Sequence, residues 1–109
     1  MSPANIEAQL KAAGPLIGQA MVVGDRRPYN VALLVLDPEA DRDGDLRARV
    51  QAEVDAANAK LSRVEQIKRF TLVAGDWLPG GDELTPTMKL KRKPIAEKYR
   101  ADIEALYAD

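Results

Sequence analysis

One apolar run constrains the fold of this chain more than any other feature. Residues 31–36 read Val-Ala-Leu-Leu-Val-Leu without a polar interruption, and Asp37-Pro38 ends the run. A strand with one side in water alternates apolar and polar residues, whereas a strand without alternation needs cover on both faces. Six residues are also far too few to cross a bilayer, which takes about 20. We therefore predict a buried central strand in a sheet that helices cover.

Two further segments are predicted to form strands beside this run. Residues 17–23 read Ile-Gly-Gln-Ala-Met-Val-Val, and a turn at residues 24–28 joins them to the central strand, which begins at Tyr29. This arrangement predicts an antiparallel hairpin. Residues 64–74 predict a third strand, although Lys68-Arg69 interrupt its apolar pattern.

Three segments show the apolar spacing of helices. In the first helix, Ser2 can act as the N-cap and Pro3 can occupy the first helical position. The second helix follows residues 43–45. The third helix starts with Pro94 at its first position and runs to the end of the chain. The residues expected on the buried faces are Ile6, Leu10 and Ala13 in the first helix, Leu46, Val50, Val54, Ala57 and Leu61 in the second, and Ile95, Tyr99, Ile103, Leu106 and Tyr107 in the third.

The element order α-β-β-α-β-α predicts an α+β fold with a three-stranded sheet covered by helices. The chain has 109 residues, 46% of them hydrophobic and 30% charged, which is the size and composition of one folded domain. We find no internal repeat and no linker that would divide it. Residues 1–109 are therefore predicted to form a single domain.

The chain has no cysteine and no histidine, and this restricts its chemistry. A disulfide, a thiolate nucleophile, an imidazole base and the usual zinc ligands are all excluded. A positioned lysine or a carboxylate pair is left for chemistry near neutral pH, and no such pair stands out. We predict no metal site. The lack of cysteine and of a basic-then-apolar leader leads us to expect a cytoplasmic location.

The net charge of −1 conceals a basic block in residues 84–100, which carry six cations against the single acid Glu97. The rest of the chain holds 10 cations and 16 acids, so the block has a local cause. Residues 84–93 read Leu-Thr-Pro-Thr-Met-Lys-Leu-Lys-Arg-Lys and follow a glycine-rich loop at residues 75–83. Their position before a helix predicts an exposed segment that is held at its far end and able to move.

This segment resembles the closing motif of the AMP-forming acyl-CoA synthetases and adenylating enzymes, whose long-chain form reads Leu-Thr-Pro-Thr-x-Lys-x-Lys-Arg. Residues 2–7, Ser-Pro-Ala-Asn-Ile-Glu, are similar to the end of the family's hinge motif, residues 17–25 to its next strand and residues 93–99 to its last helix. Nearly the whole chain is covered. Met88 stands where many relatives carry glycine before the lysine, and this departure matches the long-chain branch of the family. Asp82-Glu83 stand where relatives are often less charged.

The resemblance implies the mobile C-terminal domain of a long-chain fatty-acid–CoA ligase. Such an enzyme forms an acyl-adenylate and pyrophosphate from ATP and a fatty acid, and then passes the acyl group to CoA. Lys89 would be the catalytic lysine of the first step, delivered by a domain that swings between two orientations. ATP, Mg²⁺ and CoA would serve the full-length enzyme without binding tightly to these residues. The expected partner is a large N-terminal adenylation domain of the same polypeptide, through which any peripheral membrane contact would be made.

Several readings stay open at this point. Charge complementarity makes Lys91 and Arg92 candidates for binding CoA phosphate, and the alternative is a solvated basic face. Trp77 either docks on the large domain or closes the edge of the core. For Glu7, the helix dipole is a sufficient explanation of an acidic residue in the first turn.

The competing function is a free-standing module that binds an anionic partner such as RNA through the basic loop. The scarcity of aromatic residues and the negative net charge disfavour nucleic acid as that partner. A fragment without activity of its own is the third reading.

Overall fold

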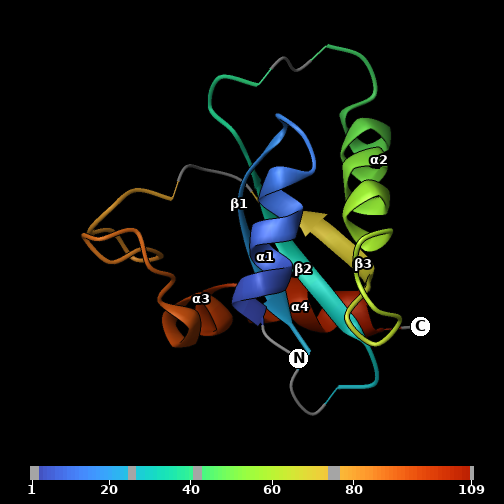
Figure 1. The fold of residues 1–109 in the computed structure, drawn as a ribbon. Helices are drawn as coiled ribbons and strands as arrows, with labels where there is room; N and C mark the ends of the chain where they lie inside the picture. The colour runs from blue at the N-terminus through green and yellow to red at the C-terminus, as the bar shows by residue number, and fades with distance from the viewer. Residues whose placement is uncertain (1–2, 25–26, 41–42, 74–76, 109) are drawn as a thin grey trace.

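The computed structural model describes residues 3–24, 27–40, 43–73 and 77–108. Along the chain it contains α1 (Pro3–Ala12), β1 (Ile17–Val23), β2 (Asn30–Leu36), α2 (Leu46–Asn58), β3 (Ile67–Leu72), α3 (Arg92–Lys98) and α4 (Arg100–Tyr107) (Figure 1). The predicted α+β class and element order are confirmed, except that the last predicted helix is divided in two.

The three strands form one sheet with β2 in the middle, as the apolar run predicts. β1 pairs antiparallel with β2, from Ile17 opposite Leu36 to Val23 opposite Val31, which confirms the hairpin. β3 pairs parallel with β2. The connection between them contains α2, which returns the chain to the end of the sheet at which β2 begins.

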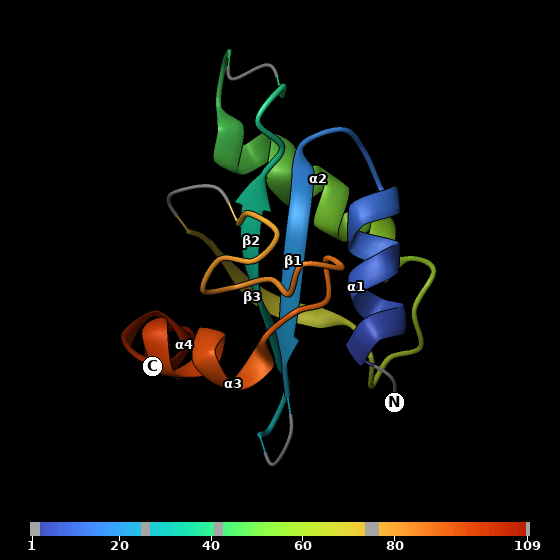
Figure 2. The same cartoon turned by 90° about the vertical axis from the view of Figure 1, so that its left-hand side faces the viewer.

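Helices cover both faces of β2, which explains why its sequence does not alternate. Ala32 and Leu34 belong to one core cluster, and Leu33 and Val35 belong to another. Figures 1 and 2 show α1 and α2 on one side of the sheet and α3 and α4 on the other. The first cluster also includes Ile6, Leu10, Val50, Val54, Ala57 and Phe70, and the second includes Met21, Trp77, Leu84, Ile95 and Ile103.

The first two helices begin close to where the sequence predicts. α1 starts at Pro3, and the proposed cap at Ser2 lies outside the described residues. α2 is capped by Asp45, whose side chain accepts the N–H of Ala48 at 3.2 Å. Although α2 ends at Asn58, Leu61 still contributes to the core.

The last predicted helix is wrong in two respects. α3 begins at Arg92, so Pro94 occupies the third helical position, where the N–H that proline lacks would have no acceptor within the helix. The helix then breaks at Tyr99, whose φ of −106° and ψ of 24° are not helical. The break lets the Tyr99 hydroxyl meet Trp77 while Ile103 packs on the sheet.

The third strand is shorter than predicted. It spans residues 67–72, Val64 is 79% exposed, and residue 74 lies outside the described residues. Lys68 and Arg69 do not interrupt the strand, because both face solvent between the buried Ile67 and Phe70. None of the helices in the described part of the chain is long and apolar enough to cross a membrane.

Candidate functional site

We call residues 84–92 the Lys89 segment. It begins at Leu84, which is completely buried, forms an antiparallel bridge with Leu90 and a parallel bridge with Pro79. The N–H of Lys91 donates to the carbonyl of Glu83 at 2.8 Å, so the two ends of the segment are tied together. The segment is therefore held at its near end as well as at the far end, because Leu84 fills a place in the core.

Thr85 closes the turn that carries Lys89. Its carbonyl accepts the N–H of Met88 at 2.9 Å, its N–H donates to the carbonyl of Lys89 at 2.8 Å, and its hydroxyl accepts the N–H of Lys89 at 3.0 Å. Met88 has φ +69°, in the left-handed region that glycine adopts at little cost. Glycine at this position would adopt the same conformation with less strain. The turn fixes the backbone of Lys89 while its side chain stays exposed.

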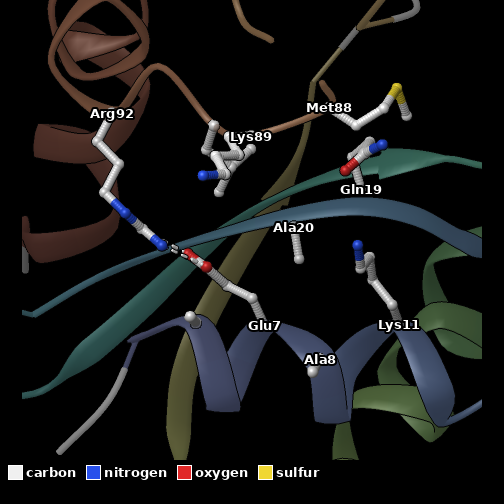
Figure 3. Close-up of a pocket in the computed structure, with 10 residues that line it drawn as sticks. Glu7, Ala8, Lys11, Gln19, Ala20, Met88, Lys89 and Arg92 are labelled. Atoms are coloured by element: carbon white, nitrogen blue, oxygen red, sulfur yellow. Dashed lines mark hydrogen bonds and ion pairs between the residues drawn. The ribbon is translucent and has the colours of Figure 1, made fainter. Parts of the chain in front are cut away.

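The Lys89 side chain borders a cleft of about 320 Å³ between α1 and the Lys89 segment. Glu7, Ala8 and Lys11 line it from α1, and Ala20 lines it from β1 (Figure 3). Within the described part of the chain, no carboxylate forms an ion pair with Lys89. An amine that is held near a cleft without a counter-ion is available to an incoming anion.

An ion pair spans this cleft, between Arg92, which lies on the same wall as Lys89, and Glu7 of α1. Arg92 donates through both terminal nitrogens to the two Glu7 oxygens, at 2.7 and 2.6 Å, and the N–H of Val22 donates to the same carboxylate at 2.8 Å. The residue Glu7 is only 5% exposed. The hydrogen bond to Glu7 raises the pKa of Arg92, so the guanidinium stays charged.

The interpretation of Glu7 as a helix-dipole residue is wrong. α1 starts at Pro3 and has no acidic residue in its first turn, and Glu7 points into the protein instead. One signal could have revealed this: Glu7 lies three residues before Leu10 and therefore shares its buried face. A carboxylate on a buried face needs a partner, and the sequence does not say which cation supplies it.

Lys91 and Arg92 do not share a cleft. The Lys91 amine donates to the carbonyl of Gly81 at 2.8 Å and borders a separate surface with Asp82 and Lys98, whereas Arg92 lines the Lys89 cleft. Both cations therefore have partners within the domain. Their role as CoA-phosphate ligands stays a prediction.

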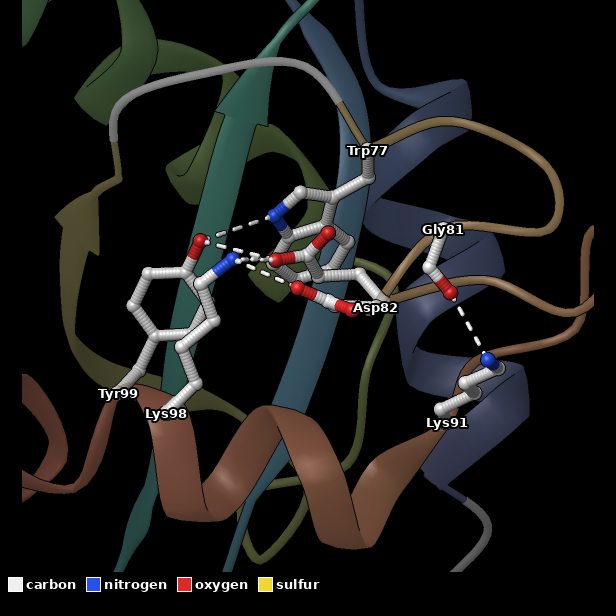
Figure 4. A network of polar contacts seen from close by, with 7 residues as sticks. Trp77, Gly81, Asp82, Lys91, Lys98 and Tyr99 are labelled. Carbon is white, nitrogen blue, oxygen red and sulfur yellow. Dashed lines mark hydrogen bonds and ion pairs between the residues drawn. The ribbon is translucent and has the colours of Figure 1, made fainter.

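A second buried carboxylate, Glu83, lies just before the Lys89 segment. It is 6% exposed, and it accepts hydrogen bonds from the amine of Lys98 and, at 3.4 Å, from the hydroxyl of Tyr99 (Figure 4). The hydrogen bond to Glu83 raises the pKa of Lys98. Trp77 donates to Tyr99 at 3.4 Å and is 5% exposed, so its side chain closes the core. The sequence marks Glu83 only as an unusual charge.

No three metal-ligating side chains gather among residues 3–24, 27–40, 43–73 and 77–108. The polar features of the site are thus cations and two buried carboxylates that hold them. Among the described residues Lys89 is exposed and forms no ion pair, and it lies at the tip of a turn that is fastened at its base. Such an arrangement suits the delivery of one positive charge to an anionic group on another surface.

Residues 1–109 match the family model described as the AMP-binding enzyme C-terminal domain. The chain belongs to this family. The putative fatty-acid–CoA ligase fadD11 of Mycobacterium tuberculosis (strain H37Rv) is 52% identical over 125 residues, covering 99% of this chain and 22% of the relative. The long-chain-fatty-acid–CoA ligase FadD15 of the same strain is 42% identical over 126 residues, covering 98% and 21%. This AMP-binding enzyme C-terminal domain therefore spans about a fifth of the curated relatives that it matches.

Solved structures share the fold of this AMP-binding enzyme C-terminal domain. The adenylation domain of a carboxylate reductase from Mycobacterium chelonae matches with a TM-score of 0.84 and 28% identity, over 100% of this chain and 18% of that chain. The corresponding domain from Segniliparus rugosus, in complex with AMP and a co-purified carboxylic acid, matches with a TM-score of 0.81 and 24% identity, over 98% and 18%. The predicted family and fold are confirmed.

Proposed function

We propose that this domain serves a long-chain fatty-acid–CoA ligase, which joins ATP and a fatty acid into an acyl-adenylate and pyrophosphate and then transfers the acyl group to the thiol of CoA. The observation that carries the proposal is Lys89, which is exposed, fastened on a turn and without an ion-pair partner among the described residues. The similarity to relatives named as fatty-acid–CoA ligases supports the choice of reaction.

In this function Lys89 places its ammonium between the fatty-acid carboxylate and the α-phosphate of ATP. These two anions repel each other and must approach closely while negative charge builds up on the phosphoryl oxygens. A preorganised cation lowers that barrier, because it needs no rearrangement at the moment of reaction. Lysine suits the task as a compact charge on a long stem, and the Thr85 hydroxyl holds the backbone from which the stem extends.

The other parts of the reaction belong to a large N-terminal domain of the same polypeptide, which is the partner that we propose. ATP, CoA and fatty acid would bind mainly there, and Mg²⁺ would accompany the ATP phosphates. The described residues offer no metal cluster, so we assign no step to a metal held by this domain. Calorimetry with the 109-residue chain should accordingly detect no low-micromolar ATP binding. We place the enzyme in the cytoplasm, with any membrane contact made by the large domain.

The proposal is tested by separating the two half-reactions in the full-length ligase. Lys89→Ala should lower the rate of adenylate formation by about 10²–10³, the usual cost of losing one preorganised electrostatic contact. Transfer from a preformed acyl-adenylate to CoA should stay within about twofold. Lys93→Ala is the matched control, because Lys93 is an exposed cation of the same basic block that does not line the Lys89 cleft. An equal loss in both half-reactions would reject the assigned role.

The competing RNA-binding module is weakened by the fate of the basic block. Arg92 and Lys98 pair with the buried Glu7 and Glu83, and Lys91 donates to a backbone carbonyl. Half of the six cations in residues 84–100 are thus engaged inside the domain. Salt-dependent binding of mixed-sequence RNA would revive this alternative.

A further inference from the structure

The ion pair between Glu7 and Arg92 connects two parts of the chain that are 85 residues apart. Glu7 belongs to α1, and Arg92 ends the Lys89 segment and opens α3. Within the described part of the chain, the bonds from Arg92 to Glu7 are the hydrogen bonds that join α1 to the Lys89 segment. The open cleft separates the two elsewhere, so the pair bridges a gap that apolar packing does not fill.

The pair has the geometry of an orienting contact. Two parallel N–H···O bonds between a planar guanidinium and a carboxylate set the direction of approach as well as the distance. The carboxylate cannot turn freely, because the N–H of Val22 in β1 also donates to it at 2.8 Å. Glu7 is buried, while the Arg92 side chain is 42% exposed. Glu7 is therefore the fixed member of the pair, and Arg92 is the member with room to move.

The position of Arg92 transmits this constraint to Lys89. The two residues are three apart, and the intervening stretch is tied down because Leu90 bridges to Leu84 and the N–H of Lys91 donates to Glu83. Lys89 and Arg92 extend from the same wall of the cleft, opposite α1 (Figure 3). A shift of Arg92 relative to α1 therefore displaces the base from which the Lys89 side chain reaches.

We propose that Glu7 and Arg92 are positioning residues, which hold the Lys89 segment against α1 so that the Lys89 amine meets the reacting carboxylate and phosphate in register. The inference rests on the proposed adenylation function and adds two residues to it. It also gives Arg92 a task that differs from contact with CoA phosphate. A displacement of about 1 Å can cost on the order of 10² in rate, so loss of register has a measurable effect.

The experiment uses the full-length ligase with Arg92→Lys, Glu7→Gln and the double variant. Lysine keeps the charge but loses the bidentate fork, and glutamine keeps the shape but loses the charge. Each single variant should lower kcat for adenylate formation about tenfold, with the KM for ATP and the transfer to CoA within about twofold of wild type. Because the two residues act as one unit, the double variant should fall no further than the worse single variant.

The matched control is the exposed pair of Arg27 and Glu104, which has the same chemistry and uses no residue of α1 or the Lys89 segment. Arg27→Lys and Glu104→Gln should leave both half-reactions unchanged. Melting temperatures of all variants establish that assays are run on folded protein.

Three results would overturn the inference. They are wild-type adenylation in Arg92→Lys, a parallel fall of both half-reactions, and a raised KM for CoA with adenylation intact, the last of which would make Arg92 a CoA ligand. Failure of the proposed function looks different: wild-type enzyme would release no pyrophosphate from ATP and fatty acid, or Lys89→Ala would be fully active.

Discussion

The Lys89 segment is held by a buried glutamate near each of its ends, and the two anchors differ in reach. The Glu83 anchor consists of Glu83, Lys98 and Tyr99, which lie within 16 residues of one another. The Glu7 anchor consists of Glu7 with Arg92, 85 residues away, and the N–H of Val22. Both carboxylates are almost inaccessible, at 5% and 6% exposure.

The difference separates the shape of the segment from its placement. The Glu83 anchor lies within the C-terminal part of the chain, where the loop before Leu84 meets α3, so it shapes the segment (Figure 4). The Glu7 anchor requires that α1 already lies on β1, since Val22 holds the carboxylate that Arg92 approaches. Local folding thus makes the turn that carries Lys89, and the tertiary structure fixes where that turn stands.

The largest expected effect comes from leaving Glu7 buried without its cation. Arg92→Ala should destabilise the 109-residue chain by up to about 3 kcal/mol, the lower end of the range for breaking a buried ion pair, because the arginine side is 42% exposed. Lys98→Ala should cost less, because it removes one hydrogen bond from Glu83, whereas Arg92→Ala removes two from Glu7; each carboxylate keeps one other donor. Urea unfolding at pH 7 measures both.

A double variant shows whether the unpaired charge is the cause. Glu7→Gln in the Arg92→Ala background removes the buried charge and should recover part of the lost stability. Equal losses for Arg92→Ala and Lys98→Ala would contradict the distinction between the two anchors.

A smaller effect is expected within the Glu83 anchor. Tyr99→Phe removes the hydroxyl that accepts from Trp77 and donates to Glu83, both at 3.4 Å, and should cost about 1 kcal/mol. The ring remains in place, so the core contact with Trp77 is kept. Tryptophan fluorescence during unfolding reports on this site directly. A loss as large as that of Arg92→Ala would mean that the local anchor also sets the placement of the segment.

The contrast between the anchors also explains what the sequence could predict. The unbroken run at residues 31–36 was sufficient to place β2 in the middle of the sheet, because periodicity is a local signal. The Glu7 anchor was missed, because a pairing across 85 residues leaves no local pattern. The break at Tyr99 was missed as well, because the contact that it allows between Tyr99 and Trp77 joins residues far apart in the sequence and leaves no local pattern. Lys89 was found through a resemblance, and no periodicity would have singled it out.

The turn between the anchors should tolerate glycine at its strained position. Met88→Gly relieves a left-handed backbone that costs a non-glycine residue about 1 kcal/mol or more, while the greater freedom of glycine in the unfolded chain offsets part of the gain. We expect a stabilisation below about 1 kcal/mol in urea unfolding. The control is Thr87→Gly, whose φ is not positive, and it should destabilise. Destabilisation by Met88→Gly would show that the methionine side chain contributes more than the backbone strain.

The smallest effect concerns Arg27 and Glu104, an ion pair outside both anchors. The hydrogen bond from Arg27 holds the pKa of the Glu104 carboxyl below its ordinary value. Because the pKa is lower in the folded state, the pair stabilises the fold fully above the ordinary glutamate pKa of about 4.3, and this contribution is lost as the pH falls through the lowered value. The difference between wild type and Glu104→Gln in urea midpoint should therefore be present at pH 7 and shrink as the pH falls below the ordinary glutamate pKa of about 4.3. Salt gives a second test at pH 7. Since Arg27 and Glu104 are both exposed, 0.5 M NaCl should reduce the difference in urea midpoint between wild type and Glu104→Gln. The loss of stability in Arg92→Ala should resist salt, because Glu7 is buried. A difference that persists unchanged at pH 3 would assign the effect of Glu104→Gln to packing rather than to charge.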